Sequence, residues 1–139
     1  LSVPVDNGAV TQLDWRATAV PDSDPVLTRA LQELAAYFHC ARTAFTVPLR
    51  PVSTPFQAGF YAALCAIPYG RTRTYGQIAA DLGVSAQAIG QACGANPIPV
   101  LIPCHRVLAS CGLGGYSGAG GVEAKVALLR LEGAASLLI

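Results

Sequence analysis

Residues 96–107 read Asn96-Pro97-Ile98-Pro99-Val100-Leu101-Ile102-Pro103-Cys104-His105-Arg106-Val107, a nearly apolar run that leads into a thiol and two basic side chains. The prolines restrict the backbone, so we expect a short, stiff and buried segment. A cysteine becomes a nucleophile when it ionises, and an adjacent basic group favours ionisation. The alternative for Cys104 is a buried cysteine that acts as a small apolar side chain. A turn or a single helical turn after Pro103 would bring His105 near the sulfur, where it could act through a water molecule.

The composition predicts a soluble globular protein. Of the 139 residues, 53% are hydrophobic and 12% are charged, which is enough for a core in one domain or in two small lobes. No apolar run approaches the roughly 20 residues of a membrane helix, and no secretion signal is recognisable. Five cysteines without C-x-x-C spacing indicate a reducing compartment, and with only two histidines we expect neither a metal site nor a cofactor.

Residues 1–53 are expected to form a small α/β lobe and a linker. The turn signal Asp6-Asn7-Gly8 favours a hairpin between residues 1–5 and 10–15. Asp24-Pro25 is a good helix start, and an amphipathic helix should run to about His39 with its apolar face formed by Leu27, Leu31, Leu34 and Phe38. Residues 43–49 could form a further strand. Nothing in this lobe indicates chemistry.

Residues 54–139 are expected to be mainly helical. Thr54 and Gln57 form a capping-box pattern before a helix whose core face would contain Phe56, Phe60, Leu64 and Ile67. Residues 75–82 should form a short helix that ends at Gly83, and Ser85 should cap the next helix, 86–94, giving a helix-turn-helix unit. A last helix is expected over 122–131, with Gly133 in the C-cap region.

Charge is spread unevenly along the chain. Before Thr54 there are four Arg against five Asp and Glu, a net charge of −1. From Thr54 onward, four Arg and one Lys oppose three acids, a net charge of +2. This bias permits contact with DNA but does not by itself indicate it.

Two further residues have a structural and a functional interpretation. Glu132 is placed near the end of the last predicted helix, where the helix dipole disfavours a carboxylate, so a partner such as a histidine would explain it. The alternative is a solvated surface Glu. Asn96 could be an ordinary helix C-cap before a proline; resemblance to a known family makes it a structural Asn that bonds to the backbone near the cysteine, and both could hold.

The stretch from Asn96 to Val107 resembles the acceptor-cysteine motif of the O6-alkylguanine-DNA alkyltransferases, and Arg130-Leu131-Glu132-Gly133 resembles their closing motif. The resemblance extends from about Thr54 to Gly133. It implies an α/β N-terminal lobe that is ribonuclease-H-like and a mainly helical, winged-helix-like DNA-binding C-terminal lobe. It also implies DNA repair by irreversible transfer of an alkyl group from guanine O6 to Cys104, in which Glu132 orients His105, His105 withdraws the thiol proton through water, and Asn96 supports the backbone.

The resemblance assigns further residues to substrate binding. Tyr116 and Ser117 lie among six glycines in residues 112–121, a composition that also fits a flexible connector. The family likeness makes this segment a lid over the flipped base, with Tyr116 protonating the leaving guanine and Ser117 bonding to O6. Pro99 would form an apolar wall, and backbone near Val107 would accept from the exocyclic amine.

For DNA, the resemblance places the helix 86–94 in the minor groove of a duplex that contains O6-alkylguanine. Ala86, Ala88 and Gly90 would allow close approach, although small residues also fit a tightly packed core helix. Tyr75 would press on the target phosphate. Gln87 stands where the family usually has an arginine finger, which predicts weaker and more salt-tolerant duplex binding. Arg71, Arg73 and Arg106 are candidates for phosphate contact or simply solvated surface charges.

Other functions remain open at this level. A lesion-binding relative without transfer activity would lack an acceptor cysteine, whereas Cys104 is present here. A Cys-His-Glu hydrolase would turn over repeatedly, and a helix-turn-helix regulator would need more base-reading side chains than Gln87 and Gln91 offer. We expect a monomer, located in the cytoplasm with the nucleoid in a prokaryote or in the nucleus of a eukaryote.

Overall fold

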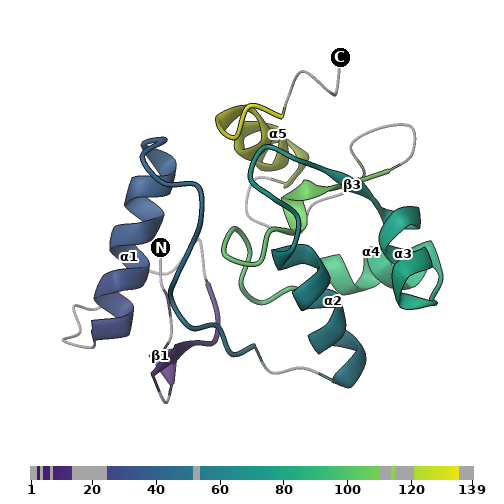
Figure 1. Ribbon diagram of the computed structural model, residues 1–139, viewed down its shortest axis with the longest axis horizontal. Coiled ribbons are helices and arrows are strands. Elements are labelled where there is room, and N and C mark those ends of the chain that lie inside the picture. The colour runs from purple at the N-terminus through teal and green to yellow at the C-terminus, as the bar shows by residue number, and fades with distance from the viewer. Residues whose placement is uncertain are drawn as a thin grey trace. The chain divides into compact units, whose positions relative to one another are not determined.

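The computed structural model describes residues 3, 5–6, 8–13, 25–51, 54–109, 114 and 121–134. The chain divides into two compact units, Leu1–Val52 and Ser53–Ile139, where the sequence predicted lobes of residues 1–53 and 54–139 (Figure 1). No helix among the described residues is long and apolar enough to cross a lipid bilayer.

The first unit contains the predicted hairpin and helix. Strand β1 (Val5–Asp6) pairs in antiparallel register with β2 (Ala9–Val10), so the turn at Gly8 is confirmed, although both strands are shorter than expected. Helix α1 (Pro25–Phe38) follows the predicted range, and it buries Leu27 and Leu34. The expected cap Asp24 lies outside the described residues.

The strand predicted over residues 43–49 is wrong, because a buried carboxylate holds this segment in an irregular conformation. Glu33 of α1 accepts hydrogen bonds from the backbone N–H groups of Thr46, at 2.8 Å, and Val47, at 3.2 Å, and from the Thr46 hydroxyl. These N–H groups are therefore unavailable to a sheet. Only Leu49 makes a bridge, in parallel, to Val10.

The second unit begins with α2 (Pro55–Cys65). Thr54 and Gln57 form the predicted capping box, with side chain to backbone bonds in both directions. Phe60, Leu64 and Ile67 are buried as expected. Phe56 is 38% exposed, because it lies in the first turn and stacks on Phe60 at the edge of the core instead of entering it.

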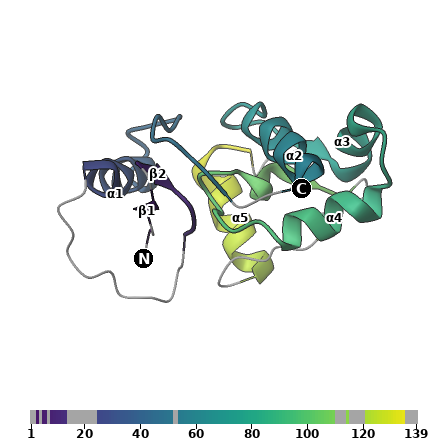
Figure 2. The same cartoon turned by 90° about the horizontal axis from the view of Figure 1, so that it is seen from below.

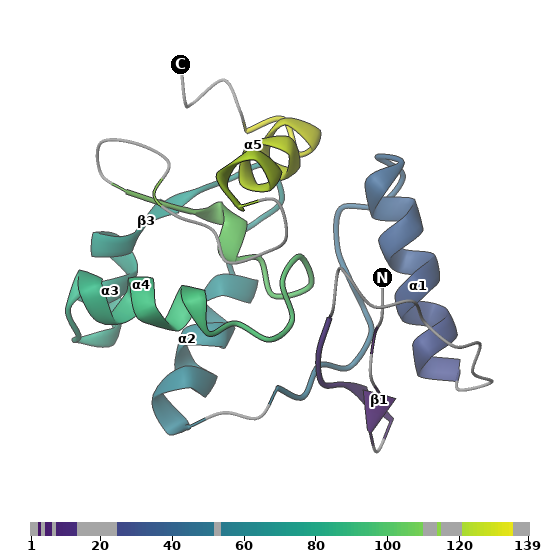
Figure 3. The same cartoon turned by 180° about the vertical axis from the view of Figure 1, so that it is seen from behind.

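Helices α3 (Tyr75–Leu82) and α4 (Ala86–Gly94) form the predicted helix-turn-helix pair, and they lie side by side in Figures 1 and 3. Gly83 ends α3 in a left-handed conformation, and the Ser85 hydroxyl caps α4 by accepting from the Ala88 N–H. The contact between the helices buries Ile78 of α3 and Ile89 of α4 completely. The pair therefore presents the other face of α4 outward.

A small parallel sheet, not predicted from the sequence, joins two segments of the unit that are distant in the sequence. Strand β3 (Arg73–Thr74) pairs with β4 (Val107–Leu108), which follows the single 3₁₀ turn η1 (Cys104–Arg106). Strands of two residues are too short to show a hydrophobic period. Helix α5 (Gly121–Leu131) packs against η1 (Figure 2), so the sheet and α5 together hold this turn in place.

Candidate active site

The segment that leads to Cys104 is a series of tight turns held by one asparagine. The Asn96 amide donates to the Ile102 carbonyl at 2.9 Å and its oxygen accepts from the Ile98 N–H at 3.0 Å. Between them, the buried β-branched Val100 has a φ of +72°, in a turn closed by the Leu101 N–H and the Pro99 carbonyl. A non-glycine residue in this region costs about 1–3 kcal/mol, so Asn96 stabilises a strained loop. The predicted backbone bonding of Asn96 is confirmed.

The turn η1 buries both the Cys104 thiol and the imidazole of the next residue, His105. Cys104 is 3% exposed and His105 is fully buried, and the single helical turn that was expected after Pro103 is confirmed. The burial also confirms the apolar, enclosed character of the segment from residue 98 onward. The active atoms are therefore sheltered from bulk water.

Glu132 is a buried partner of His105 and not a surface residue. It follows the last residue of α5, and its Oε2 lies 2.7 Å from His105 Nε2. Gly70 approaches it closely: its N–H lies 3.4 Å from Glu132 Oε1, and a Cβ at this position would lie 3.0 Å from the Glu132 carbonyl oxygen. With a φ of +77° as well, this position requires glycine.

The bond to Glu132 determines which nitrogen of His105 can accept a proton. A carboxylate can only accept, so Nε2 carries the hydrogen and Nδ1 keeps its lone pair. His105 Nδ1 is buried and has no hydrogen-bond partner among the described residues. Burial lowers the pKa of His105, and the nearby Arg106 and Lys125 act in the same direction against the opposing effect of Glu132. The imidazole is therefore neutral, with an open acceptor.

Burial raises the pKa of the Cys104 thiol above its ordinary value. Three interactions oppose this effect: a hydrogen bond from the Asn96 side chain, the positive charge of Lys125, and a backbone hydrogen bond. The resting sulfur is therefore a protonated thiol beside groups that stabilise its anion. A neutral thiol and a neutral imidazole are the starting pair for general-base activation.

Arg106 does not lie where the sequence interpretation placed it. It was a candidate for phosphate contact, but it is 6% exposed. Its Nε and Nη2 donate to the two oxygens of Glu132 at 2.8 and 2.9 Å, and its Nη1 donates to the Ile67 carbonyl at 2.8 Å. The DNA-contact assignment is wrong because every nitrogen of the guanidinium is engaged inside the protein.

Lys125 is the site residue that sequence reasoning missed. It is fully buried in α5, and its ammonium donates to the Val107 carbonyl at 2.6 Å and lies 5.7 Å from the centre of the Tyr75 ring. The signal was present, since Lys125 falls on the same helical face as the buried Leu128 and Leu129. The Val107 carbonyl, expected to bind the guanine amine, would have to share its oxygen with this lysine.

Residues 55–134 match the family described as 6-O-methylguanine DNA methyltransferase, DNA binding domain. The chain belongs to this family. The match includes Asn96, Cys104, His105, Lys125 and Glu132, whose side chains or backbone the structure brings together around one turn.

Named relatives agree with the family. The chain is 44% identical over 121 residues to the methylated-DNA–protein-cysteine methyltransferase of Methanosarcina acetivorans, covering 82% of this chain and 76% of that protein. It is 47% identical over 106 residues to the protein of the same name from Mycobacterium tuberculosis strain H37Rv, covering 74% of this chain but only 63% of that protein. The crystal structure of M. tuberculosis OGT in complex with DNA has a TM-score of 0.80 and 39% identity, covering 94% of this chain and 84% of that one.

The remaining predicted residues of this methyltransferase-family chain fall into two groups. Pro99 is buried within the strained turn, and Tyr75, at the start of α3, is half-buried with its ring over Lys125. Burial raises the pKa of Tyr75 to about 12, so its hydroxyl is a neutral donor. Tyr116 and Ser117 lie outside the described residues. The described Gly114 lies against Tyr75, because a Cβ there would come within 2.7 Å of the ring.

The outward face of α4 is made of small and uncharged residues. Ala86, Gln87 and Gly90 are exposed and Ala88 is half-buried, while Ile89, Ala92 and Cys93 face the core. The interpretation of α4 as a core helix of small residues is therefore wrong for this face. A Cβ added at Gly90 or Gly94 would meet nothing within 4 Å in the described part of the chain, where no contact requires glycine at either position.

Proposed function

We propose that this chain repairs DNA by a single, irreversible alkyl transfer from O6-alkylguanine to Cys104. The sulfur attacks the alkyl carbon, an S–C bond forms, and the bond between that carbon and guanine O6 breaks. The thiol proton passes to His105, and the leaving guanine gains a proton in turn. The product is a thioether with no easy route back, so the protein acts once.

The observation that carries this proposal is the open, buried Nδ1 of His105. Its partner nitrogen is bonded to Glu132, so Nδ1 is the one ring atom that can take a proton. A buried acceptor without a partner costs about 1–3 kcal/mol, which a bridging water or a proton from Cys104 would recover. We infer a relay in which Glu132 fixes His105, and His105 takes the Cys104 proton through one water.

The anion that forms would be stabilised where it arises. The Asn96 amide and the Lys125 ammonium both lower the pKa of Cys104 against the opposing effect of burial. Because both groups are buried and held by other bonds, they need little rearrangement as charge develops on sulfur. The neutral Tyr75 hydroxyl nearby adds no competing charge.

Duplex DNA would approach through α4. Glycine inside a helix costs about 0.5–1 kcal/mol relative to alanine, and no contact with the described residues offsets that cost at Gly90 or Gly94. A surface without side chains lets a helix lie close to a partner, which suits the minor groove of a duplex. Tyr75 would press on the phosphate of the flipped nucleotide, and Tyr116 and Ser117 would cover the base.

The finer description of the fold belongs to the same proposal. A ribonuclease-H-like N-terminal lobe and a winged-helix-like C-terminal lobe fit the hairpin with α1 and the helix-turn-helix pair with its small sheet. Repair of one lesion by one acceptor cysteine requires one chain, so we propose a monomer. Its place would be with the DNA, in the cytoplasm of a prokaryote or the nucleus of a eukaryote.

Intact-mass measurement after incubation with a duplex containing O6-methylguanine tests the proposal. We expect a gain of about 14 Da, one CH₂, that maps to Cys104 and is absent in Cys104→Ala, with no further gain when substrate is in excess. Cys93→Ala is a matched control, since it removes the other described buried thiol. Lesion binding without an adduct would identify a damage sensor, and repeated turnover on an ester or amide would identify a hydrolase; either result contradicts alkyl transfer.

A further inference from the structure

Arg106 is placed to control the pair that activates Cys104. Its guanidinium meets the Glu132 carboxylate edge to edge, with Nε on Oε1 at 2.8 Å and Nη2 on Oε2 at 2.9 Å. Paired N–H···O bonds of this kind fix both the distance and the plane of the carboxylate. The third nitrogen, Nη1, is bonded to the Ile67 carbonyl, just after α2. The carboxylate is therefore held from a rigid element outside its own helix.

Glu132 is shared between Arg106 and His105. The oxygen Oε2 accepts from Arg106 Nη2 and also, at 2.7 Å, from His105 Nε2. A carboxylate that could rotate would move the imidazole bonded to it, and the position of Nδ1 would change with the ring. Because the guanidinium fixes the carboxylate plane, it also fixes the direction of the histidine ring.

Arg106 also acts on the charge of His105. The charged groups that face this imidazole are Glu132 and Lys125 from α5 and its end, and Arg106 from η1. Toward Cys104 lie Tyr61 of α2, Tyr75 of α3 and Cys93 of α4, which are neutral near pH 7 because burial raises the pKa of each. A second proton on His105 would therefore be repelled by the two cations, Arg106 and Lys125, and attracted by one anion, Glu132. A permanent guanidinium opposes that proton at every working pH.

We propose that Arg106 is a positioning residue for the alkyl transfer, which aims His105 through Glu132 and keeps it available as a base, and that it has no part in binding DNA. This inference rests on the proposed function. It predicts that loss of the arginine charge makes the reaction fail at a higher pH than in the wild type. It also predicts that DNA affinity keeps its dependence on salt.

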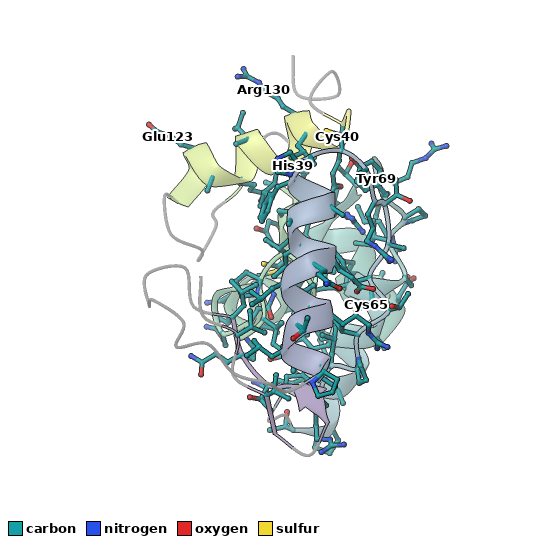
Figure 4. All side chains as sticks on the ribbon, turned by 90° about the vertical axis from the view of Figure 1, so that its left-hand side faces the viewer. His39, Cys40, Cys65, Tyr69, Glu123 and Arg130 are labelled. Carbon is teal, nitrogen blue, oxygen red and sulfur yellow. The ribbon has the colours of Figure 1, made fainter. Side chains whose placement is uncertain are left out.

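The test compares Arg106→Met with Arg106→Lys and with the charge-matched control Arg130→Met. Arg130 is exposed and extends away from the end of α5 (Figure 4). Three quantities are measured: the rate of adduct formation against pH, the NMR titration of the His105 ring in DNA-free protein, and the salt dependence of duplex binding. The chain has only one other histidine, His39, which provides the reference signal.

We expect Arg106→Met to move the acid limb of the rate profile and the His105 titration upward by about one pH unit or more. Arg106→Lys keeps the charge, so the acid limb and the His105 titration should stay near those of the wild type. Its plateau rate should fall, because one ammonium cannot form the paired bonds. Arg130→Met should change neither. A phosphate contact would add about 0.9 to the salt slope, so the slope should be the same for Arg106→Met and the wild type.

Removing one partner of a buried ion pair is strongly destabilising. If Arg106→Met is unfolded, Arg106→Gln, which keeps one donor for the carboxylate, gives the same pH test. An unmoved acid limb and His105 titration in a folded neutral variant, or a salt slope reduced by about one, would overturn the proposal. If the wild type forms no adduct, the proposed function fails, whereas the His105 titration still decides whether Arg106 controls this histidine.

Discussion

Among the described residues of the second unit, four side chains of the Glu, His, Lys and Arg types are buried: His105, Arg106, Lys125 and Glu132. Buried charges are costly unless they are paired, and here each bonds to another member of the group or to a backbone carbonyl. The consequence for Cys104 is a thiol that is protonated at rest, because burial raises its pKa, yet ready to ionise beside Lys125. Reactivity therefore comes from the neighbours of the sulfur and not from exposure.

Replacing Lys125 by methionine should slow alkyl transfer at pH 7 by about tenfold or more. The ammonium lowers the pKa of Cys104, and each unit by which that pKa rises cuts the thiolate fraction tenfold. The rate of adduct formation against pH measures the effect, with Lys125→Arg as the control that keeps the charge. A Lys125→Met protein that is folded and reacts at the wild-type rate would show that this charge is unimportant.

At the scale of elements, local signals decided where helices begin and end. The capping boxes at Thr54–Gln57 and Thr74–Gln77 start α2 and α3, and Gly83 with Ser85 separates α3 from α4. Each of these signals spans four residues or fewer, so it can be read directly from the chain. The outward face of α4 follows from the same local geometry, since Ile89, Ala92 and Cys93 point the other way.

Gln87 is the position on α4 where one substitution should strengthen DNA binding. Arginine at this exposed site would add a positive charge and a longer side chain to fill the gap left by a flipped base. We expect Gln87→Arg to steepen the salt slope of duplex binding by about 0.9 and to raise the rate of duplex repair.

Gln32→Arg, on the exposed face of α1 in the other unit, adds the same charge elsewhere and serves as the control. Binding and repair are measured for both variants across a range of salt concentrations. If Gln87→Arg matches the wild type in rate, affinity and slope, α4 does not approach the duplex through this residue.

At the scale of the whole molecule, the two units differ in charge and in what stabilises them. The first carries a net charge of −1 and the second +2, so the excess of positive charge lies with the unit that contains Cys104. In the first unit, the buried Glu33 holds the chain over residues 46 and 47, and Arg42 lies 3.2 Å from its carboxylate. Burial tends to raise the pKa of Glu33, but the bonds from Thr46 and Val47 and the charge of Arg42 together hold it below 4.5.

The stability of the first unit should therefore decrease as the pH falls into the acidic range. Because the folded pKa of Glu33 lies below the unfolded value of 4.5, its contribution is present above that pH and is lost as the pH falls through the folded value. We expect Glu33→Gln to lower the free energy of local opening at residues 46 and 47 by about 2 kcal/mol at pH 7. The difference in this free energy between the variant and the wild type should become smaller below pH 4.5.

Hydrogen exchange of the Thr46 and Val47 amides reports this opening directly. Glu123→Gln, at an exposed position that extends away from α5 (Figure 4), is the matched control and should leave exchange unchanged. Equal protection of both amides in Glu33→Gln and the wild type at pH 7 would mean that the carboxylate does not stabilise this segment.

The sequence by itself determined the helices of both units, the hairpin turn and the enclosed position of Cys104, and its resemblance to the family named the residues of the proposed relay. Those features depend on short patterns: caps, a hydrophobic period, prolines around a thiol. Only the tertiary structure decided that Glu132 and Arg106 meet, that Lys125 reaches the Val107 carbonyl, that residues 43–49 are irregular and that β3 pairs with β4. These contacts join groups between 13 and 34 positions apart, as from Glu33 to Thr46 and from Arg73 to Val107. Burying such polar groups is costly unless each meets a partner, and which partners meet depends on the fold and not on a local pattern.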